Sequence, residues 1–180
     1  MKYYIISGEA SGDMHGANLI SELNKMQPEA QIRGWGGDKM AAEGVEITKH
    51  YKELAFMGFA EVLLNLKTIL GNFKTCKKEI VEYKPDAVIL IDYPGFNLRM
   101  AEYIHSLDIP VFYDISPTVW EWKKNRVEKI KKFVDKLFVI LPFEKPFYKE
   151  CGYEVEFVGH PILDDINKFK KEHISSDFNK

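Results

Sequence analysis

The sequence predicts an α/β fold in which helices cover both faces of a parallel sheet, and three observations lead to that prediction. Seven short runs of β-type residues alternate with helical patterns, an order typical of parallel strands joined by helical crossovers. The run at 87–91 is apolar at every position, as a strand covered on both faces requires, so it should lie near the sheet centre. The chain also opens with an apolar run, a glycine-rich turn and a helical pattern.

Taken in order, the β-type runs predict strands at residues 3–7, 31–35, 45–48, 87–92, 111–115, 136–141 and 155–158. The periodic segments between them predict helices at 16–26, 38–43, 56–73, 73–83 after a break at Gly71, 98–107, 124–134 and 143–151. The tail from Asn167 is charged and has no strand signal. We therefore expect a domain at 1–166 and a linker at 167–180.

Composition excludes several classes of protein. With 180 residues, of which 46% are hydrophobic and 29% charged, the chain is long enough for one full core. A net charge of −2 offers no electrostatic footprint for nucleic acid. Cys76 and Cys151 have neither disulfide-framework nor metal-ligand spacing, which fits a reducing compartment. We expect neither a metal nor a cofactor. The first apolar run begins directly after Met1-Lys2 and is too short for a signal peptide, and no apolar run approaches ~20 residues, so we expect neither secretion nor a membrane span.

The turn at 7–13 carries two carboxylates, Glu9 and Asp13, which would repel a phosphate. Its glycine spacing also differs from the dinucleotide-binding pattern. A polyol fits better, because sugar hydroxyls donate hydrogen bonds to carboxylates. The alternative is structural: Gly8 and Gly12 serve the turn and Asp13 caps the helix. For Gly12 and Asp13 alone we favour the structural alternative, whereas Glu9 has no such duty.

Four segments are expected to share one edge of the sheet, because ligands gather beyond the carboxyl ends of parallel strands. They are residues 8–13, 92–97, 116–120 and 159–161, and together they predict a single cleft.

Asp92 ends the most apolar strand, where a carboxylate is costly to bury. Partial burial raises the pKa of an Asp and makes it a stronger base, suited to deprotonating an attacking alcohol. The structural alternative is a helix N-cap, but Tyr93-Pro94-Gly95 intervenes before the expected helix, so we favour function. For His160 two interpretations have equal weight: it is a second candidate base, or it forms a hydrogen bond with the backbone.

Aromatic and cationic side chains follow the fifth strand. Trp120, Trp122 and Arg126 could stack on a sugar or pair with a phosphate. The alternative is that one Trp belongs to the core and that the nearby lysines form a solvated helix face, which we favour for the lysines.

The helix expected at 56–73 has an apolar arc covering roughly two-thirds of its circumference, with Glu61, Asn65, Thr68 and Asn72 as a narrow polar stripe. Such an arc indicates one of two situations: the helix is deeply buried, either within this chain or by a partner chain, or part of it contacts a membrane interface. The residues alone favour burial slightly.

Seven motifs, in order, resemble those of lipid-A-disaccharide synthase: Ser-Gly-Glu-Ala-Ser-Gly-Asp at 7–13, Trp-Gly-Gly-Asp-Lys-Met at 35–40, Met-Gly-Phe-Ala-Glu-Val-Leu at 57–63, Ile-Asp-Tyr-Pro-Gly-Phe-Asn at 91–97, Ile-Ser-Pro-Thr-Val-Trp-Glu-Trp at 115–122, Leu-Pro-Phe-Glu at 141–144 and Phe-Val-Gly-His-Pro at 157–161. Together they cover nearly the whole chain. The resemblance implies a Rossmann-like half of a two-domain, GT-B-like glycosyltransferase. Such an enzyme joins UDP-2,3-diacylglucosamine to 2,3-diacylglucosamine 1-phosphate (lipid X) by a β-1,6 linkage and releases UDP.

The resemblance also implies roles and partners. Asp92 falls on the family's candidate base, and the apolar helix falls on its membrane-associating segment, which reverses our preference for burial. Gly95 departs from members that have an acid there. The expected substrate-binding residues are Glu9, Ser11, Gly12, Asn97, Ser116, Trp120, Arg126 and His160, and the expected membrane contacts are Val62, Leu63, Leu66 and Ile69.

The resemblance further implies a cytoplasmic, peripheral location on the inner membrane, a C-terminal UDP-sugar domain absent from these residues, and a possible homodimer. Without that second domain the chain should be inactive. Two alternatives stay open: a non-catalytic, membrane-associated module that binds a lipid-linked sugar phosphate, and a flavodoxin-like phosphate or nucleotide binder, which the acidic first turn disfavours.

Overall fold

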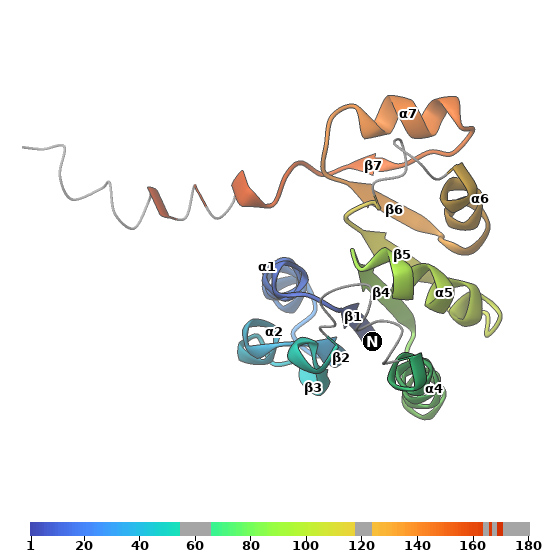
Figure 1. The fold of residues 1–180 in the computed structure, drawn as a ribbon. Coiled ribbons are helices and arrows are strands. Elements are labelled where there is room, and N and C mark those ends of the chain that lie inside the picture. The colour runs from blue at the N-terminus through green and yellow to red at the C-terminus, as the bar shows by residue number, and fades with distance from the viewer. Residues whose placement is uncertain (55–65, 118–123, 164–165, 167–168, 171–180) are drawn as a thin grey trace, which may run out of the picture.

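The structure, a computed structural model, describes residues 1–54, 66–117, 124–163, 166 and 169–170. Seven parallel strands form one sheet in the order β3-β2-β1-β4-β5-β6-β7 (Figure 1). The strand with the continuous apolar run, β4, is the middle one and is buried throughout, as predicted. The strands are β1 (Lys2–Ser7), β2 (Gln31–Gly36), β3 (Glu46–His50), β4 (Ala87–Ile91), β5 (Val111–Asp114), β6 (Lys136–Val139) and β7 (Glu156–Phe157).

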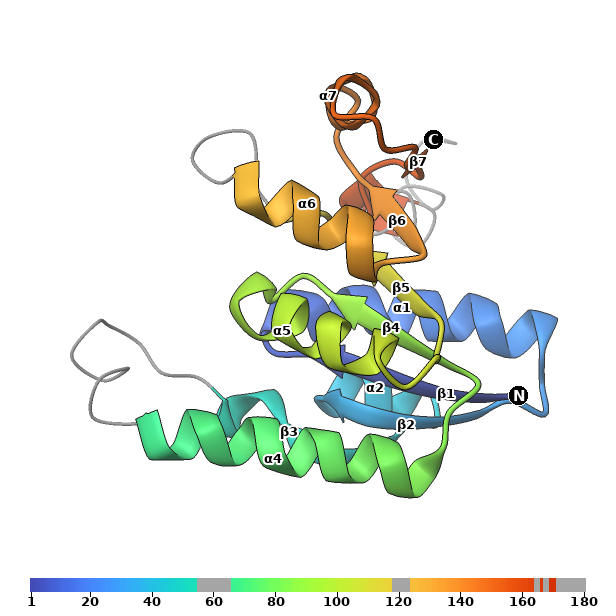
Figure 2. The same cartoon turned by 90° about the vertical axis from the view of Figure 1, so that its right-hand side faces the viewer.

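Helices lie on both faces of the sheet, which confirms the predicted fold class. Helices α1 (Ala10–Met26) and α2 (Asp38–Ala42) cover one face, and α4 (Leu66–Tyr83), α5 (Pro94–His105) and α6 (Lys124–Phe133) cover the other (Figures 1 and 2). A 3-10 turn, η1 (Tyr51–Glu53), follows β3, and α7 (Glu144–Glu150) lies beside β7. Strand side chains alternate between the two cores: Tyr4 and Ile6 join the larger core, and Tyr3 and Ile5 the smaller.

One side chain of α4 ties that helix to three neighbouring strands. The Glu79 carboxylate accepts hydrogen bonds from the Trp35 indole N–H at 2.9 Å, the Thr48 hydroxyl at 2.8 Å and the Tyr4 hydroxyl. These donors come from β2, β3 and β1. Because one carboxylate oxygen gathers all three bonds, α4 is fixed against the half of the sheet that ends in β3.

Helices α1 and α5 begin earlier than predicted. We expected a loop through Asp13, since two glycines disfavour a helix, but α1 already begins at Ala10 and its first turn closes with Asp13 N–H donating to Glu9 O at 2.9 Å. Packing overrides propensity here, because a side chain at Gly12 would stand 2.4 Å from Ser7 Oγ. Likewise α5 begins at Pro94, not at residue 98, with proline in the first turn, where its missing N–H costs nothing.

The predicted break at Gly71 is wrong, because α4 runs from Leu66 to Tyr83 without interruption. A Cβ at Gly71 would meet nothing within 4 Å, so this glycine sits on an open face of a continuous helix. Asn72 was assigned to the polar stripe and is instead 7% exposed. The expected helix N-terminal to Leu66 lies outside the described residues.

Candidate active site

The carboxyl ends of β1, β4 and β5 lie side by side. In the sheet register Ser7 pairs with Ile91, and Ile91 pairs with Asp114. The turns that follow these strands, which begin at Gly8, Asp92 and Ile115, therefore meet at one edge of the sheet, as the sequence predicted for three of the four segments.

Asp92 lies half-buried immediately after the central strand. Burial raises the pKa of its carboxyl above the ordinary value of ~3.9, and the negative charge of Glu9 raises it further. The Tyr93 N–H opposes these effects by hydrogen bonding to the carboxylate. A carboxylate in this setting holds a proton more strongly than a solvated Asp, which is the property a general base needs.

The reason given for excluding an N-cap role at Asp92 is wrong, although Asp92 is not the cap. The helix follows at once, with Tyr93 as the N-cap of α5 and Pro94 as its first residue. Asp92 and Tyr93 both have left-handed backbone conformations, with φ of 44° and 49°. Residues with a Cβ rarely adopt this conformation, so the turn is strained where the candidate base sits.

Glu9 and Ser11 are exposed beside this turn. Glu9 is the N-cap residue of α1, but its side chain makes no capping bond, which agrees with the absence of a structural duty predicted for it. Ser11 lies in the first turn of α1, and Gly12 is buried against Ser7. Of this segment, the side chains of Glu9 and Ser11 are the ones available to a ligand.

Asp13 is a structural residue, and its capping role differs from the predicted one. Its carboxylate accepts hydrogen bonds from the N–H groups of Gly37 at 2.7 Å, Lys39 at 3.1 Å and Met40 at 3.1 Å. It therefore caps α2 and not its own helix. At 3% exposure its carboxylate is not available to a sugar, which agrees with the structural alternative that the sequence favoured for Asp13.

Asn97 is fully buried in the first turn of α5. Its side-chain amide donates to the main-chain oxygens of Asp92 at 2.8 Å, Ile91 at 3.2 Å and Ile6 at 3.4 Å. These bonds join the ends of β1 and β4 to α5. Asn97 thus shapes the turn from beneath, which favours a positioning role over the predicted contact with substrate.

Ser116 belongs to a buried polar network after β5. Its hydroxyl lies 2.7 Å from the Tyr148 hydroxyl and donates to Pro117 O at 3.1 Å. Nearby, the buried Glu144 accepts the N–H groups of Ile140 and Leu141 at 3.1 and 2.8 Å. This network supports the turn from within. Trp120 lies outside the described residues.

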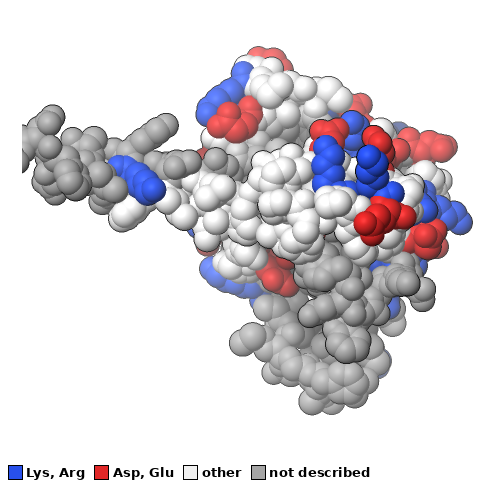
Figure 3. Space-filling view, turned by 90° about the horizontal axis from the view of Figure 1, so that it is seen from above, with Lys and Arg blue, Asp and Glu red and all other residues white. Residues whose placement is uncertain are grey.

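Arg126 is half-buried in α6, close enough to Tyr113 for its charge to oppose the rise in the pKa of that hydroxyl. Lysines of the same helix follow the predicted structural alternative. Lys129 pairs with Glu102 at 3.4 Å and Lys131 with Glu128 at 3.6 Å. On the face shown in Figure 3, cationic and anionic side chains are interspersed and do not form a single basic patch.

His160 is half-buried in the turn after β7, and its Nδ1 accepts the N–H of Ile162 at 3.2 Å. The backbone interaction left open by the sequence is therefore present. The neighbouring Gly159 and Pro161 line a cavity of about 530 Å³, together with Asp114 and side chains of α1.

Sequence reasoning missed Asp114 and Tyr113. Burial raises the pKa of the Asp114 carboxyl to about 6, against an opposing hydrogen bond from the Ile115 N–H. The Tyr113 hydroxyl donates to Asp92 O at 2.6 Å. Both were hidden because the strand was predicted to run through residue 115. The signal that identified Asp92, an acid after an apolar run, also marks Asp114.

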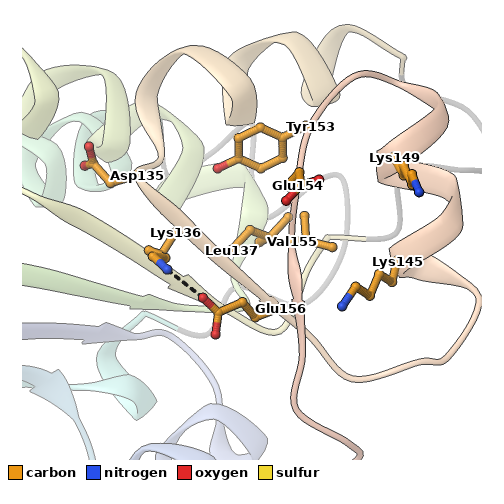
Figure 4. Close-up of a pocket in the computed structure, with 9 residues that line it drawn as sticks. All are labelled: Asp135, Lys136, Leu137, Lys145, Lys149, Tyr153, Glu154, Val155 and Glu156. Atoms are coloured by element: carbon orange, nitrogen blue, oxygen red, sulfur yellow. Dashed lines mark hydrogen bonds and ion pairs between the residues drawn. The ribbon is translucent and has the colours of Figure 1, made fainter.

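A second cavity, of about 510 Å³, lies at the opposite edge of the sheet, near the starts of β6 and β7 (Figure 4). Its rim combines Lys136, Lys145 and Lys149 with acidic side chains, and Lys136 pairs with Glu156 at 2.6 Å. Because Asp92 lies beyond the other ends of the strands, this cavity takes no part in the candidate site.

Two searches of the described part of the chain bear on cofactors and membranes. Within the described ranges, no group of three or more His, Cys, Asp or Glu side chains is arranged to hold a metal ion. No described helix is long and apolar enough to cross a bilayer.

Solved structures share this fold. The UDP-GlcNAc 2-epimerase of Neisseria meningitidis, bound to UDP-GlcNAc, superposes with a TM-score of 0.68 at 13% identity, covering 98% of this chain and 51% of that one. The calicheamicin glycosyltransferase CalG4 gives a TM-score of 0.50 at 16% identity, covering 88% of this chain and 52% of that one. At these identities the likeness concerns the fold alone, and it confirms the predicted Rossmann-like, GT-B-like class.

Sequence comparison is more specific. The family model for lipid-A-disaccharide synthetase matches residues 3–180. The lipid-A-disaccharide synthase of Syntrophus aciditrophicus is 46% identical over 162 residues, which are 90% of this chain and 42% of that protein. The enzyme of Nitrosococcus oceani is 43% identical over 175 residues, or 97% of this chain and 45% of that protein. This chain thus spans less than half the length of these relatives, and it belongs to the lipid-A-disaccharide synthetase family.

Proposed function

We propose that this chain is the acceptor-side half of a lipid-A-disaccharide synthase. The whole enzyme would join UDP-2,3-diacylglucosamine to lipid X through a β-1,6 linkage and release UDP. Family membership supports this activity. One observation supports the position of the active site most strongly. The Asp92 carboxyl is half-buried at the end of the central strand, and burial together with the nearby exposed Glu9 raises its pKa.

Asp92 acts as the general base in the proposed reaction. It takes the proton of the acceptor's 6-hydroxyl as that oxygen attacks the anomeric carbon of the donor sugar. The bond from that carbon to the UDP oxygen breaks on the opposite side, UDP leaves with the electron pair, and the configuration inverts. The proton ends on Asp92, whose raised pKa makes it a better acceptor than a solvated carboxylate.

The other site residues hold the acceptor. Glu9 and Ser11 are exposed and can bond to sugar hydroxyls, while Arg126 can pair with the 1-phosphate of lipid X. His160 and Trp120 border the acceptor in this proposal. Asn97 and Ser116 support the turns after β4 and β5 in this proposal, because their side chains form hydrogen bonds with neighbouring protein atoms.

We place the enzyme on the cytoplasmic surface of the inner membrane, where its acylated substrates reside. The proposed contact is the apolar segment that includes Val62, Leu63, Leu66 and Ile69, and the 64% exposure of Leu70 in the adjoining turn of α4 supports it. Replacing Ile69 or Leu70 with Ser should reduce co-sedimentation with liposomes without unfolding the domain. A loss of ~2–5 kcal/mol in stability would instead identify a core position.

The donor's nucleotide site lies, in this proposal, on a C-terminal domain beyond these residues. The relatives' greater length supports a second domain, and a homodimer of the whole protein is compatible with the proposal. At the candidate site described above, a diphosphate would meet the exposed carboxylate of Glu9, and the two negative charges would repel each other.

The test is release of UDP from UDP-2,3-diacylglucosamine in the presence of lipid X. The chain alone should be inactive, whereas the completed polypeptide, in which it is followed by the remaining length found in its relatives, should turn over. Positioning donor and acceptor together supplies up to about 7–11 kcal/mol of the barrier reduction. Robust turnover by the chain alone would contradict the division of labour. An inactive completed polypeptide that still binds lipid X would support a non-catalytic binding module instead.

A further inference from the structure

The turn that carries Asp92 adopts a conformation that its own residues disfavour. Asp92 and Tyr93 have φ of 44° and 49°, and neither is glycine. Two successive left-handed residues persist only where surrounding structure holds them. The contacts that hold this turn therefore determine where the Asp92 carboxylate points.

Both main-chain polar groups of Asp92 are held by hydrogen bonds to residues outside the left-handed pair Asp92 and Tyr93. Its N–H donates to Asp114 O at 3.0 Å, extending the β4–β5 ladder by one residue. Its carbonyl accepts two hydrogen bonds, from the Tyr113 hydroxyl at 2.6 Å and from Asn97 Nδ2 at 2.8 Å. Two donors use both lone pairs of the carbonyl oxygen, so the peptide plane has no freedom to rotate without breaking a bond.

Tyr113 is suited to this role by its place in the sheet. It stands opposite Leu90, one residue before the end of β5, and its ring is fully buried in the larger core. From there the ring reaches along the sheet, so that the hydroxyl meets the carbonyl just beyond β4. A buried tyrosine hydroxyl needs a partner, and here the partner is the main chain of the candidate base.

We propose that Tyr113 is a positioning residue for the glycosyl-transfer reaction: its buried hydroxyl anchors the Asp92 carbonyl and thereby fixes the strained turn that presents the Asp92 carboxylate to the acceptor. The inference rests on the proposed role of Asp92 as the base. In this proposal Tyr113 acts through Asp92 and contacts neither the substrate nor the transferred proton.

The test compares Tyr113→Phe with Tyr153→Phe in the completed polypeptide. Tyr153 is a matched control, because its hydroxyl also donates to a main-chain oxygen, that of Val134 at 2.7 Å, near the opposite edge of the sheet. Tyr113→Phe should lower kcat by about 10- to 100-fold, the scale of a small misplacement of a reacting group, with KM for lipid X within about twofold. Tyr153→Phe should leave both unchanged. An unchanged kcat in Tyr113→Phe, or an equal loss in both variants, would overturn the proposal.

A double-mutant cycle separates this proposal from the proposed function. If Tyr113 acts through Asp92, adding Tyr113→Phe to Asp92→Asn should cause no further loss. Independent, multiplicative losses would overturn the positioning role while leaving Asp92 as the base. An Asp92→Asn variant with full turnover would instead remove the proposed function itself.

Hydrogen exchange supplies a readout that does not need turnover. In Tyr113→Phe the Asp92 amide should exchange faster than in the wild type, because the turn is less restrained, whereas the β1 amides should be unchanged. Wild-type exchange at Asp92 would contradict the anchoring role, and faster exchange throughout the sheet would assign Tyr113 to global stability alone.

Discussion

The segments that follow β1 (residues 8–13, the β1 turn) and β4 (residues 92–97, the β4 turn) look alike in sequence and differ in what they do. Each follows an apolar strand, contains glycine, carries at least one acidic residue and runs into the first turn of a helix. After β1, Gly12 is packed against Ser7 and Asp13 is consumed in capping α2. After β4, Gly95 has open space around it and Asp92 remains half-buried at the edge, in a strained turn.

The difference separates an acid that serves the fold from an acid that is a candidate for catalysis. Asp13 accepts three main-chain N–H groups, so its charge is satisfied by the protein. The pKa of the Asp92 carboxyl is raised by burial and by the charge of Glu9. A hydrogen bond from the neighbouring Tyr93 N–H opposes this rise without cancelling it. A carboxylate that the fold does not fully satisfy is the one left to act on a substrate.

The largest expected effect is on the β4 turn. Asp92→Asn in the completed polypeptide should lower turnover by about 10²–10⁴, the usual contribution of a general base, with the melting temperature little changed. Asp108→Asn is the matched control, since Asp108 is an exposed acid that also has a positive φ, of 55°. Near wild-type UDP release by Asp92→Asn would remove this residue from the mechanism.

The opposite result is expected for the β1 turn. Asp13→Ala should lower the free energy of unfolding by roughly 2–4 kcal/mol, because the N–H groups at the start of α2 lose their acceptor. Asp38→Ala, at an exposed acid of the same helix, should cost under about 1 kcal/mol. Denaturant unfolding measures both. Equal, small losses would show that the α2 cap contributes little.

Asp114 is a third acid at the carboxyl ends of the strands, and we expect it to make the stability of the protein depend on pH. Its folded-state pKa of about 6 exceeds the ordinary value of ~3.9, so the folded state binds more protons and stability should fall as pH rises between these values. Asp114→Asn should remove this slope and stabilise the protein at pH 7 by roughly 3 kcal/mol, because the two pKa values differ by about two units and each unit corresponds to about 1.4 kcal/mol. Thermal melts at pH 4 and pH 7 test this; an unchanged slope would contradict it.

The smallest effect concerns the coupling between the two turns. Glu9→Gln should move the acidic limb of the pH–rate profile to lower pH, because a nearby negative charge no longer raises the pKa of Asp92. Ser11→Ala, a neutral change in the same turn, should not move the limb. A shift to higher pH in Glu9→Gln would reverse the electrostatic assignment.

Sequence patterns predicted the sheet well because its signals are local. Short runs of β-type residues identified each strand of the described ranges within a few residues, and the uninterrupted apolar run at 87–91 identified the central position of β4. Helix starts were less accurate, because glycine and proline were taken as breakers. At Gly12 close packing, and at Pro94 the first helical turn, make these residues suitable.

The site was only partly predictable for a related reason. Asp92 and Glu9 could be found because an acid after a buried strand lacks a local partner. The duties of Asp13 and Tyr113 depend on partners 24 and 21 residues away in the chain, which no local pattern reveals. Long-range hydrogen bonds therefore decide which of the polar residues at this edge serve the fold.

Burial and the charge of Glu9 together raise the pKa of Asp92 and so prepare it for the proposed role of base, and a carboxyl-carbon NMR titration of Asp92 tests this most directly. In the wild-type chain the titration midpoint should lie above ~3.9, and in Glu9→Gln it should be lower than in the wild type. A midpoint at or below ~3.9 that Glu9→Gln leaves unchanged would show that neither burial nor Glu9 prepares Asp92 as a base.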